Sequence, residues 1–339
     1  MGVPGRREKA DTMNQGTLVP ERALLDLTLT GAERDELGQV AALLADAGRR
    51  LVDDREWLAQ ARELTSRLPL RLREVVRRYR HDPGDDAVMT LRNLPVGDPG
   101  LPETPTVAES VERTATVPAA VAVLISLYLG EVVAYRDEKS GALVQNVVPV
   151  PGREESQSNA GSIPLELHVE NAFHAHRPDF VGLLCLRNDH SGTAGTLVSS
   201  VRRAVRLLPD DVRDVLFQPR FVTEAPPSFR SARSVEGHPV LEGIPDDPNV
   251  RVDFNATSPL DDTAKAALEL LRTAFLDVSA SLVLQPGEMA FLDNRIAIHG
   301  RTAFTPRYDG RDRWLHRTFV HLDNRRGLAQ RADGGPVIS

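Results

Sequence analysis

Residues 165–173 read LELHVENAF, and apolar and polar side chains alternate along them. The alternation predicts a half-buried strand with one apolar face (Leu165, Leu167 and Val169) and one polar face (Glu166, His168 and Glu170). An imidazole and a carboxylate on one face can both bind a divalent metal ion. A histidine beside a glutamate at the rim of a sheet gives the same pattern, so the pair does not decide between the two readings.

Other short runs rich in β-branched and aromatic residues surround this stretch and predict further strands. Two of them flank a glycine-containing turn in VVAYRDEKSGALVQNVVPV, and the rest are FVGLLCLRN, GTLVSS, VRVDFNA, LVLQPGEMAFLDN, RIAIHGR and RWLHRTFVHL. Two helices are expected between them, across SSVRRAVRLLPDDVRDVLF and SPLDDTAKAALELLRTAFL, the second with Ser258 as its cap and Pro259 in its first turn.

The amino-terminal third has a helical period instead, from residue 31 to 80 and again in AESVERTATVPAAVAVLISLYLG. We expect a disordered leader over residues 1–16 and a single domain over 17–339. In that domain, residues 17–130 would be mainly helical and residues 131–325 would form a β core with helical insertions. Successive strands after a helical third predict an α+β fold, a barrel or double-sheet jelly roll clad by helices. A doubly wound sheet is disfavoured, because regular strand-helix alternation and a GxGxxG loop are absent.

The composition narrows the class of partner. The chain has 41 basic and 48 acidic residues among 339, a formal charge of −7, which gives no electrostatic footprint for nucleic acid. A small-molecule partner is the default expectation. The single cysteine, Cys185, excludes an intrachain disulfide and suits a reducing cytoplasm. The longest apolar run, PAAVAVLISLYLG, is shorter than the roughly 20 residues that span a bilayer, so no membrane helix is expected. The oligomeric state is left open.

A later histidine supports the metal reading of the opening stretch. In LQPGEMAFLDNRIAIHGRTAF, a predicted strand ends at His299 and is followed by glycine, so that His299 can reach into the mouth of a barrel. Two histidines and a carboxylate would occupy one face of an octahedral iron and leave positions for a chelating cosubstrate and oxygen. A second pair with the same spacing, His321 and Asp323, is a weaker candidate because no histidine follows it.

Two arginines on the next predicted strand suggest the charge of the ligands. Arg313 and Arg317 are four residues apart and share a face, separated by roughly 13 Å. A guanidinium group binds a carboxylate in bidentate fashion, and an unpaired charge in a cavity is costly. Two acidic ligands, or one ligand and a structural acidic residue, are therefore expected. Surface arginines on an edge strand are the alternative.

Taken together, LHVENAF, FVGLLCLRN, GTLV, LDNRIAIHGR and the spacing of the two arginines resemble iron(II)- and 2-oxoglutarate-dependent oxygenases. The similarity is greatest to the clavaminate synthase-like branch of the taurine dioxygenase superfamily, which includes hydroxylases of free arginine, asparagine and lysine. It covers residues 120 to 325 and implies a double-stranded β-helix, or jelly roll. It also implies Fe(II) as the metal and 2-oxoglutarate and O2 as cosubstrates, in a cytoplasmic enzyme of natural-product or antibiotic biosynthesis.

The resemblance also implies roles for individual residues. His168, Glu170 and His299 would bind the iron, and Arg313 with Thr196 would hold the distal carboxylate of 2-oxoglutarate. The remaining assignments concern the substrate. Arg317 would bind the α-carboxylate of an amino acid, Ser158 lies in a polar loop expected to contact it, and Glu170 can also receive its amine.

The far end of the substrate is expected to meet Asp253 and Asn255 in VRVDFNA. Arginine hydroxylases of this branch present two aspartates there, so the asparagine is a departure. One carboxylate and one amide suit lysine or the neutral urea of citrulline, and arginine stays possible. A solvated turn is the alternative for this pair. The expected activity is thus hydroxylation of a free L-amino acid with a long polar side chain (citrulline, lysine or arginine).

Several alternatives stay open at this point. A carrier-bound amino acid is possible, although it would leave Arg317 without a carboxylate, and desaturation can replace hydroxylation. Halogenation is disfavoured because Glu170 keeps a carboxylate in the triad. A zinc hydrolase would add His174 and His176 to the ligands. A non-catalytic barrel that binds an acidic metabolite would need no metal. The polar segment 218–237 is a candidate lid over the substrate, or an ordinary surface loop.

Overall fold

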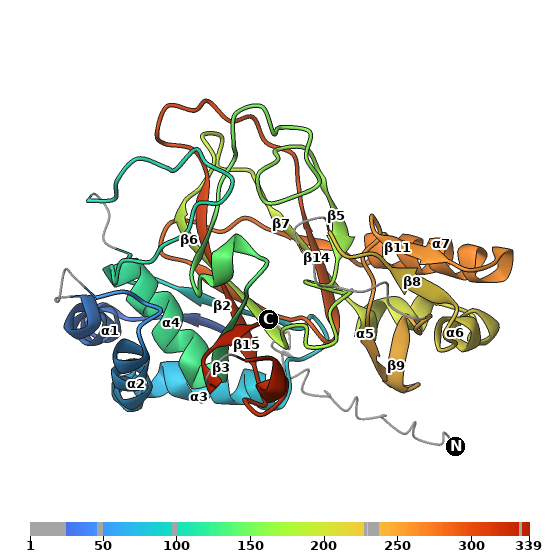
Figure 1. The fold of residues 1–339 in the computed structure, drawn as a ribbon, viewed down its shortest axis with the longest axis horizontal. Coiled ribbons are helices and arrows are strands. Elements are labelled where there is room, and N and C mark those ends of the chain that lie inside the picture. The colour runs from blue at the N-terminus through green and yellow to red at the C-terminus, as the bar shows by residue number, and fades with distance from the viewer. Residues whose placement is uncertain (1–24, 46–49, 97–99, 227–228, 230–236, 332–333) are drawn as a thin grey trace, which may run out of the picture.

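The computed structural model describes residues 25–45, 50–96, 100–226, 229, 237–331 and 334–339. Two β-sheets lie at the centre of the protein and helices cover them (Figure 1). The predicted leader, residues 1–16, lies outside the described residues, and so do residues 227–228 and 230–236 of the predicted lid. The boundaries of the single domain therefore stay a prediction.

The amino-terminal third forms the helices α1 (Gly31–Ala45), α2 (Arg55–Leu64), α3 (Leu70–His81) and α4 (Val117–Leu129). The first three confirm the helical period between residues 31 and 80. The fourth begins at Val117 and not near residue 108, because the Thr116 side chain accepts a hydrogen bond from the Ala119 amide and Pro118 suits the first turn. These helices pack their apolar faces around α4 and against one face of the larger sheet.

The larger sheet has eight strands. In spatial order these are β1 (Asp26–Thr28), β2 (Val88–Arg92), β13 (Met289–Asp293), β6 (Phe180–Arg187), β15 (Trp314–His321), β3 (Glu131–Tyr135) and β16 (Val337–Ile338), while β4 (Gln145–Val147) pairs with β15 beside β3. The central pairs are antiparallel, and β1–β2 and β3–β16 are parallel. Strands β1 and β2 correct the expectation for residues 17–130, because this mainly helical part also supplies two strands.

The smaller sheet has the order β12 (Ala280–Leu282), β7 (Thr196–Ser200), β14 (Ala297–Arg301) and β5 (Leu165–His168), with every pair antiparallel. Gly300 permits the close approach of β14 to β5, since a Cβ atom there would lie 2.5 Å from the Leu165 carbonyl oxygen. A second apolar core joins residues of both sheets, among them Leu167 and Ile298 of the smaller and Leu183 and Leu315 of the larger. The sheets therefore face one another.

The other elements surround the smaller sheet: α5 (Val201–Ala204), α6 (Asp210–Leu216), α7 (Asp262–Asp277) and the strand pairs β8 (Phe221–Thr223) with β11 (Thr257–Pro259) and β9 (Leu241–Ile244) with β10 (Asp247–Val250). Short 3-10 turns cover Thr65–Arg67, Lys139–Gly141, Val205–Leu207 and Leu328–Gln330.

Three predictions about this region are wrong. The single helix across residues 199–217 is two helices, α5 and α6, with a 3-10 turn and Pro209 between them. The cap of α7 is Asp261, whose side chain accepts from the Ala264 amide at 2.9 Å, whereas Ser258 lies in β11. Of the predicted strand VRVDFNA only Val250 lies in a strand.

Candidate active site

Three of the predicted residues come together where the two sheets meet. His168 ends β5, Glu170 follows it by two residues, and His299 lies directly opposite His168 on β14. One ligand atom from each lies within 4.8 Å of the others. The two imidazole centroids are 4.3 Å apart, and His299 Nε2 lies 3.5 Å from a Glu170 carboxylate oxygen. The backbone thus brings two imidazole nitrogens and a carboxylate oxygen close enough together to bind one metal ion.

Both histidines present a suitable ring for a metal ion. His168 Nδ1 donates to the Glu166 carbonyl oxygen at 2.9 Å, which leaves the lone pair of Nε2 for a ligand. Burial, and then the neighbouring His168, lower the pKa of His299, so that its neutral, ligating form is favoured. Glu166 itself turns to Arg272 of α7 and does not join the group. The donor set of two imidazoles and a carboxylate fits Fe(II).

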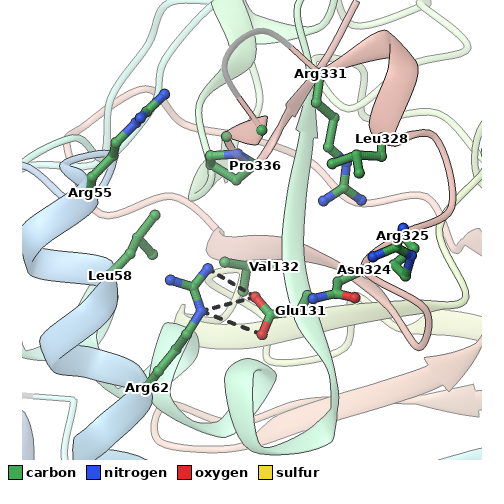
Figure 2. A pocket seen from close by; sticks show the side chains of 12 residues that line it. Arg55, Leu58, Arg62, Glu131, Val132, Asn324, Arg325, Leu328, Arg331 and Pro336 are labelled. Atoms are coloured by element: carbon green, nitrogen blue, oxygen red, sulfur yellow. Dashed lines mark hydrogen bonds and ion pairs between the residues drawn. The ribbon is translucent and has the colours of Figure 1, made fainter.

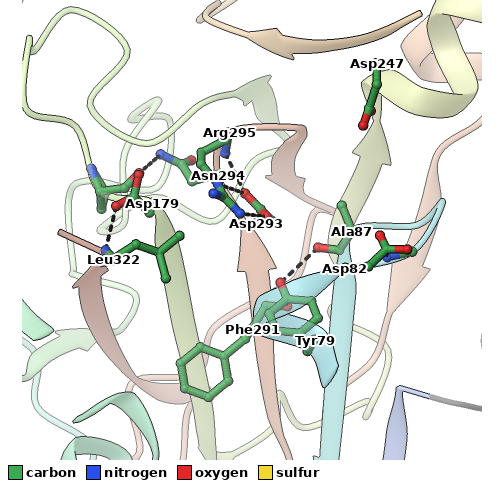
Figure 3. Close-up of polar contacts among 12 residues, drawn as sticks. Tyr79, Asp82, Ala87, Asp179, Asp247, Phe291, Asp293, Asn294, Arg295 and Leu322 are labelled. Carbon is green, nitrogen blue, oxygen red and sulfur yellow. Dashed lines mark hydrogen bonds and ion pairs between the residues drawn. The ribbon is translucent and has the colours of Figure 1, made fainter. Parts of the chain in front are cut away.

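The turn between β13 and β14 holds the backbone of Glu170 in place. Asn294 accepts a hydrogen bond from the Glu170 amide at 2.8 Å and returns one to its carbonyl oxygen at 3.1 Å. The Asn294 amide in turn donates to the Asp179 carbonyl oxygen at 2.8 Å, and the buried Asp293 pairs with Arg295 beside it (Figure 3). Since Asn294 is 1% exposed, these contacts are shielded from water and position the carboxylate firmly.

Arg317 of β15 closes the site from the larger sheet. Its Nη1 donates to both carboxylate oxygens of Glu170, at 3.0 and 2.9 Å, and its other nitrogens contact Glu138 and Gln145. The guanidinium group is buried, with 3% exposure. Burial would raise the pKa of Glu170, but Arg317 and His299 outweigh it and hold that pKa below its ordinary value. The carboxylate therefore stays ionised, as a metal ligand requires.

Arg313 lies at the other end of the same cavity and has a different surrounding. It is 5% exposed, and its Nη2 lies 3.5 Å from Thr196 Oγ1 of β7. No carboxylate among the described residues lies within ion-pair distance of it. A buried cation without a counter-ion is costly, so this end of the cavity favours an anionic ligand.

A cavity of about 30 Å³ joins these groups. Its lining includes five of the predicted site residues, namely Glu170, Thr196, His299, Arg313 and Arg317, together with Val147, Asn159, Leu165, Leu183, Gly300, Arg301 and Leu315. Polar and charged side chains thus form most of the lining, and four aliphatic side chains form the rest, a combination that suits a small charged ligand.

The other three predicted substrate residues, after Arg317 and Glu170, are arranged less simply. Ser158 is exposed, and its hydroxyl contacts Ser156 at 2.8 Å. Asp253 pairs with His168 through an isolated backbone bridge, and its Oδ1 accepts from the Asn255 amide at 2.8 Å. Asn255 is exposed. Their roles stay predictions, and the geometry favours Asp253 over the other two.

Sequence reasoning missed three side chains at the site. Glu138 contacts Arg317 from the turn after β3. Asn159, next to the predicted Ser158, accepts from Arg317 at 2.9 and 3.1 Å when its amide oxygen faces the guanidinium. Arg301 ends β14 and lines the cavity. Glu138 and Asn159 lie in turns without periodicity, but Arg301 directly follows His299-Gly300 and was recognisable as a third arginine.

The other histidines have structural surroundings. His174 Nδ1 accepts from the His176 amide at 3.0 Å, and neither residue belongs to a group of metal-binding geometry within the described ranges. His321 is buried, donates to the His176 carbonyl oxygen and accepts from Arg331. One further group of metal-binding geometry, formed by His190, Asp309 and Asp312, lies near the surface.

A larger cavity, of about 420 Å³, lies between α2, β3 and the carboxy-terminal segment (Figure 2). Arg62 pairs there with Glu131 at 2.9 Å, and Arg325 and Arg331 line the same space. It contains none of the predicted site residues, so the candidate chemistry does not lie there. No helix in the described part of the chain has the length and apolar character needed to cross a membrane.

Comparison with known proteins identifies the family. Residues 113–319 match the model of the taurine catabolism dioxygenase TauD/TfdA family. L-asparagine oxygenase of Streptomyces coelicolor is 48% identical over 92% of this chain and 94% of its own length. Clavaminate synthase 2 of Streptomyces clavuligerus is 34% identical over 90% and 95%.

A solved structure gives the same result for the whole fold. Asparagine oxygenase in complex with Fe(II), (2S,3S)-3-hydroxyasparagine and succinate superimposes with a TM-score of 0.90 at 47% identity, covering 93% of this chain and 99% of that one. The chain therefore belongs to the TauD/TfdA family of dioxygenases, enzymes that use iron(II), 2-oxoglutarate and dioxygen.

Proposed function

We propose that this protein hydroxylates a free L-α-amino acid and that L-asparagine is its first candidate substrate. The observation that carries the proposal is the buried Arg317, held between the carboxylates of Glu138 and Glu170 beside the paired histidines His168 and His299. Charges of both signs next to a metal-binding group are complementary to the ammonium and carboxylate groups of an amino acid.

The fold supports the same proposal. The larger and smaller sheets face one another across an apolar core, and the strands that carry His168, His299 and Arg317 meet at one end of it. We assign this arrangement to a double-stranded β-helix, with β2, β13, β6 and β15 in one layer and β12, β7, β14 and β5 in the other.

His168, Glu170 and His299 would hold the iron. Bound there, iron(II) would supply the centre for the reaction of dioxygen with 2-oxoglutarate, in which one oxygen atom enters succinate as carbon dioxide is released and the other enters a C–H bond of the substrate. The chain's own residues position the reactants. The Asn294 amide fixes the backbone of Glu170, and the His168 contact with the Glu166 carbonyl fixes the ring that faces the site.

Arg313 and Thr196 would bind the distal carboxylate of 2-oxoglutarate. The guanidinium group has free donors in a buried position, and the threonine hydroxyl lies 3.5 Å from it. A carboxylate placed between them would receive charge-assisted hydrogen bonds and would neutralise the buried cation. The apolar neighbours Leu183 and Leu315 would exclude water from the chain of the cosubstrate.

Arg317 would bind the α-carboxylate of the amino acid, and Glu138 would receive its ammonium group. Asn159 adds an amide that can contact either group. When the metal binds Glu170, the Arg317 donors that now contact that carboxylate become available for the substrate. A carrier-bound amino acid has no free carboxylate, so this arrangement favours a free substrate.

Asp253 is the candidate contact for the end of the side chain, because it adjoins His168 while Asn255 is exposed. A single carboxylate accepts a hydrogen bond from a neutral carboxamide and repels a second carboxylate, which favours asparagine over aspartate. The expected long substrates, citrulline, lysine and arginine, are not supported by the 48% identity to an asparagine oxygenase. We propose hydroxylation at the β-carbon and leave desaturation as a minor outcome.

The proposal is tested by aerobic incubation of the protein with iron(II), ascorbate, 2-oxoglutarate and, separately, asparagine, aspartate, citrulline, lysine and arginine. Succinate formation and product mass are measured. We expect succinate with a gain of one oxygen for asparagine, and loss of both when Glu170 is replaced by alanine. His174→Gln is the matched control and keeps the activity, whereas a zinc site with His174 would lose it. Succinate with none of the five, in protein shown to hold iron, would contradict the proposal.

A further inference from the structure

Arg301 is a third buried arginine of the active-site cavity, and it is not among the residues proposed to bind iron, 2-oxoglutarate or the amino acid. It is the last residue of β14, two residues after His299, and is 4% exposed. Within the described chain no carboxylate lies within ion-pair distance of its guanidinium group. A cation buried without a counter-ion needs other partners.

Its partners are backbone carbonyl groups of one loop. Arg301 Nη1 donates to the Ser158 carbonyl oxygen at 3.3 Å, and Nη2 donates to the Ile163 carbonyl oxygen at 3.1 Å. These two carbonyls flank Asn159, whose side chain faces Arg317 in the cavity. The arginine therefore ties the strand that carries a metal ligand to the loop that carries a candidate substrate contact. We call residues 153–164 the substrate loop.

A second feature connects Arg301 to the cosubstrate. Its guanidinium carbon lies 5.7 Å from the centre of the Phe304 ring, and that of Arg313 lies 5.9 Å from the same ring. Both side chains line one cavity, so two like charges are close together in a medium of low polarity. A carboxylate bound by Arg313 would offset their repulsion and would favour the position of Arg301 that holds the loop.

We propose that Arg301 is a positioning residue through which binding of 2-oxoglutarate strengthens binding of the amino-acid substrate, by holding the substrate loop and Asn159 against β14. This inference rests on the proposed function, because it takes the ligand of Arg313 to be a dicarboxylate. It assigns Arg301 no direct contact with either reactant. It also accounts for an arginine, and not an apolar residue, at the buried end of β14.

The test measures the coupling between the two ligands in iron(II)-loaded protein without oxygen. The dissociation constant of asparagine is determined by calorimetry with and without 2-oxoglutarate. In the unaltered protein we expect 2-oxoglutarate to tighten asparagine binding at least about fivefold, the lower end of ordinary coupling between sites. In Arg301→Gln we expect this ratio to fall close to one, while 2-oxoglutarate itself still binds.

Hydrogen exchange provides a readout that does not depend on turnover. Amides of the substrate loop should exchange more slowly when 2-oxoglutarate is added to the unaltered protein, and this protection should be absent in Arg301→Gln. Arg272→Gln is the matched control, because Arg272 is half-exposed and contacts Glu166 of the neighbouring β5 but not the loop. It should keep both the ratio and the protection.

The possible results distinguish the positioning role of Arg301 from a direct contact with 2-oxoglutarate and from failure of the proposed function. An unchanged ratio and unchanged protection in Arg301→Gln would overturn the positioning role. A larger loss of 2-oxoglutarate affinity than of asparagine affinity would instead make Arg301 a direct cosubstrate ligand and would also overturn it. If Arg301→Gln does not fold, Arg301→Met takes its place, since methionine has neither the charge nor the donors of arginine, and an unchanged ratio there has the same meaning. Unaltered protein that binds neither ligand would contradict the proposed function and not this inference alone.

Discussion

The two ends of the active-site cavity each carry a buried arginine of the same strand region, but the two arginines have different neighbours. Arg317 contacts two carboxylates, those of Glu138 and Glu170, whereas Arg313 lies 3.5 Å from the Thr196 hydroxyl and has no carboxylate within ion-pair distance among the described residues. Both are almost inaccessible to water. The difference shows at which end the buried charge has acidic partners before any ligand binds and at which end it has none among the described residues.

The difference between the two arginines also predicts which of them contributes to the stability of the fold and which mainly to ligand binding. Around Arg317, the charges compensate one another before any ligand arrives, so the residue contributes to the folded state as well as to the site. Around Arg313, the charge is uncompensated and its cost is offset only when a ligand binds. We therefore expect substitutions at the two ends to have different effects on the free energy of unfolding and on the Michaelis constants.

The largest effect is expected for Arg317→Ala. Removal of one partner of a buried ion pair leaves the other charge uncompensated, so the free energy of unfolding should fall by about 3–5 kcal/mol. Binding of the amino acid should be lost as well. Urea unfolding and calorimetric titration measure the two quantities. An unchanged urea midpoint would show that burial of Glu138 and Glu170 costs no stability in the absence of Arg317. The predicted difference between the two arginines would then be wrong.

Arg313→Ala should have the opposite pattern. No carboxylate is left without a partner, so the urea midpoint should change much less than in Arg317→Ala. The Michaelis constant for 2-oxoglutarate should rise about 100-fold, which corresponds to the loss of hydrogen bonds to a charged group. Steady-state kinetics at varied 2-oxoglutarate and varied amino acid distinguish the two ends. If only the Michaelis constant for the amino acid rises, the ligands proposed for Arg313 and Arg317 must be exchanged.

Asp253 and Asn255 provide a smaller and more local test of the substrate end. Asp253→Ala should lower kcat/KM for asparagine about tenfold, because one hydrogen bond to the carboxamide is lost. Asn255→Ala should leave it unchanged, since Asn255 is exposed. The ratio of kcat/KM for asparagine and aspartate is measured in both variants. Equal effects of the two substitutions would indicate that Asp253 and Asn255 form an ordinary solvated turn and do not bind the substrate.

A further effect, on stability alone, is expected from the opposite face of the same strand. His316 is buried against the helices, neither ring nitrogen has a partner, and burial lowers its pKa to about 3 from an ordinary value of 6.5. The unfolded chain therefore protonates His316 below about pH 6.5, whereas the folded protein keeps this ring neutral down to about pH 3. Stability from the neutral ring is present above this window and is lost as the pH falls through it.

The variant His316→Leu should therefore reduce the slope of unfolding free energy against pH between pH 4 and 6 by about 1 kcal/mol per pH unit. Urea unfolding at several pH values measures the slope. His81→Gln is a control, since His81 is exposed at the end of α3. The same slope in His316→Leu and the unaltered protein would show that His316 has a partner in solution.

The sequence predicted the strand-borne part of the site. Alternation placed His168 and Glu170 together, although β5 ends at His168, and the spacing of Arg313 and Arg317 placed both in one cavity. The strand predicted to end at His299 instead continues to Arg301. A strand has one side-chain period, so residue types and spacing are enough to indicate which residues share a face. The pairing of the strands into two facing sheets could not be read from the period, which does not say which strands pair, and the prediction of a jelly roll depended on the family resemblance.

The parts that could not be predicted lie in turns or depend on distant contacts. Glu138 and Asn159 reach Arg317 from irregular segments, whose direction is fixed by tertiary hydrogen bonds and not by a period. The cap of α7 moved from Ser258 to Asp261 because residues 257–259 pair with β8. Strand β2 was missed since its pairing with β13 joins segments about 200 residues apart.

We expect 2-oxoglutarate to occupy the Arg313 end of the cavity and the amino acid to occupy the Arg317 end. A crystal structure of the protein with iron(II), 2-oxoglutarate and asparagine, prepared without oxygen, tests it most directly. We predict the distal carboxylate of 2-oxoglutarate between Arg313 and Thr196, and the asparagine carboxylate on Arg317 with its ammonium group at Glu138. An amino-acid carboxylate on Arg313, or an Arg317 that remains paired only with Glu138 and Glu170, would contradict the account.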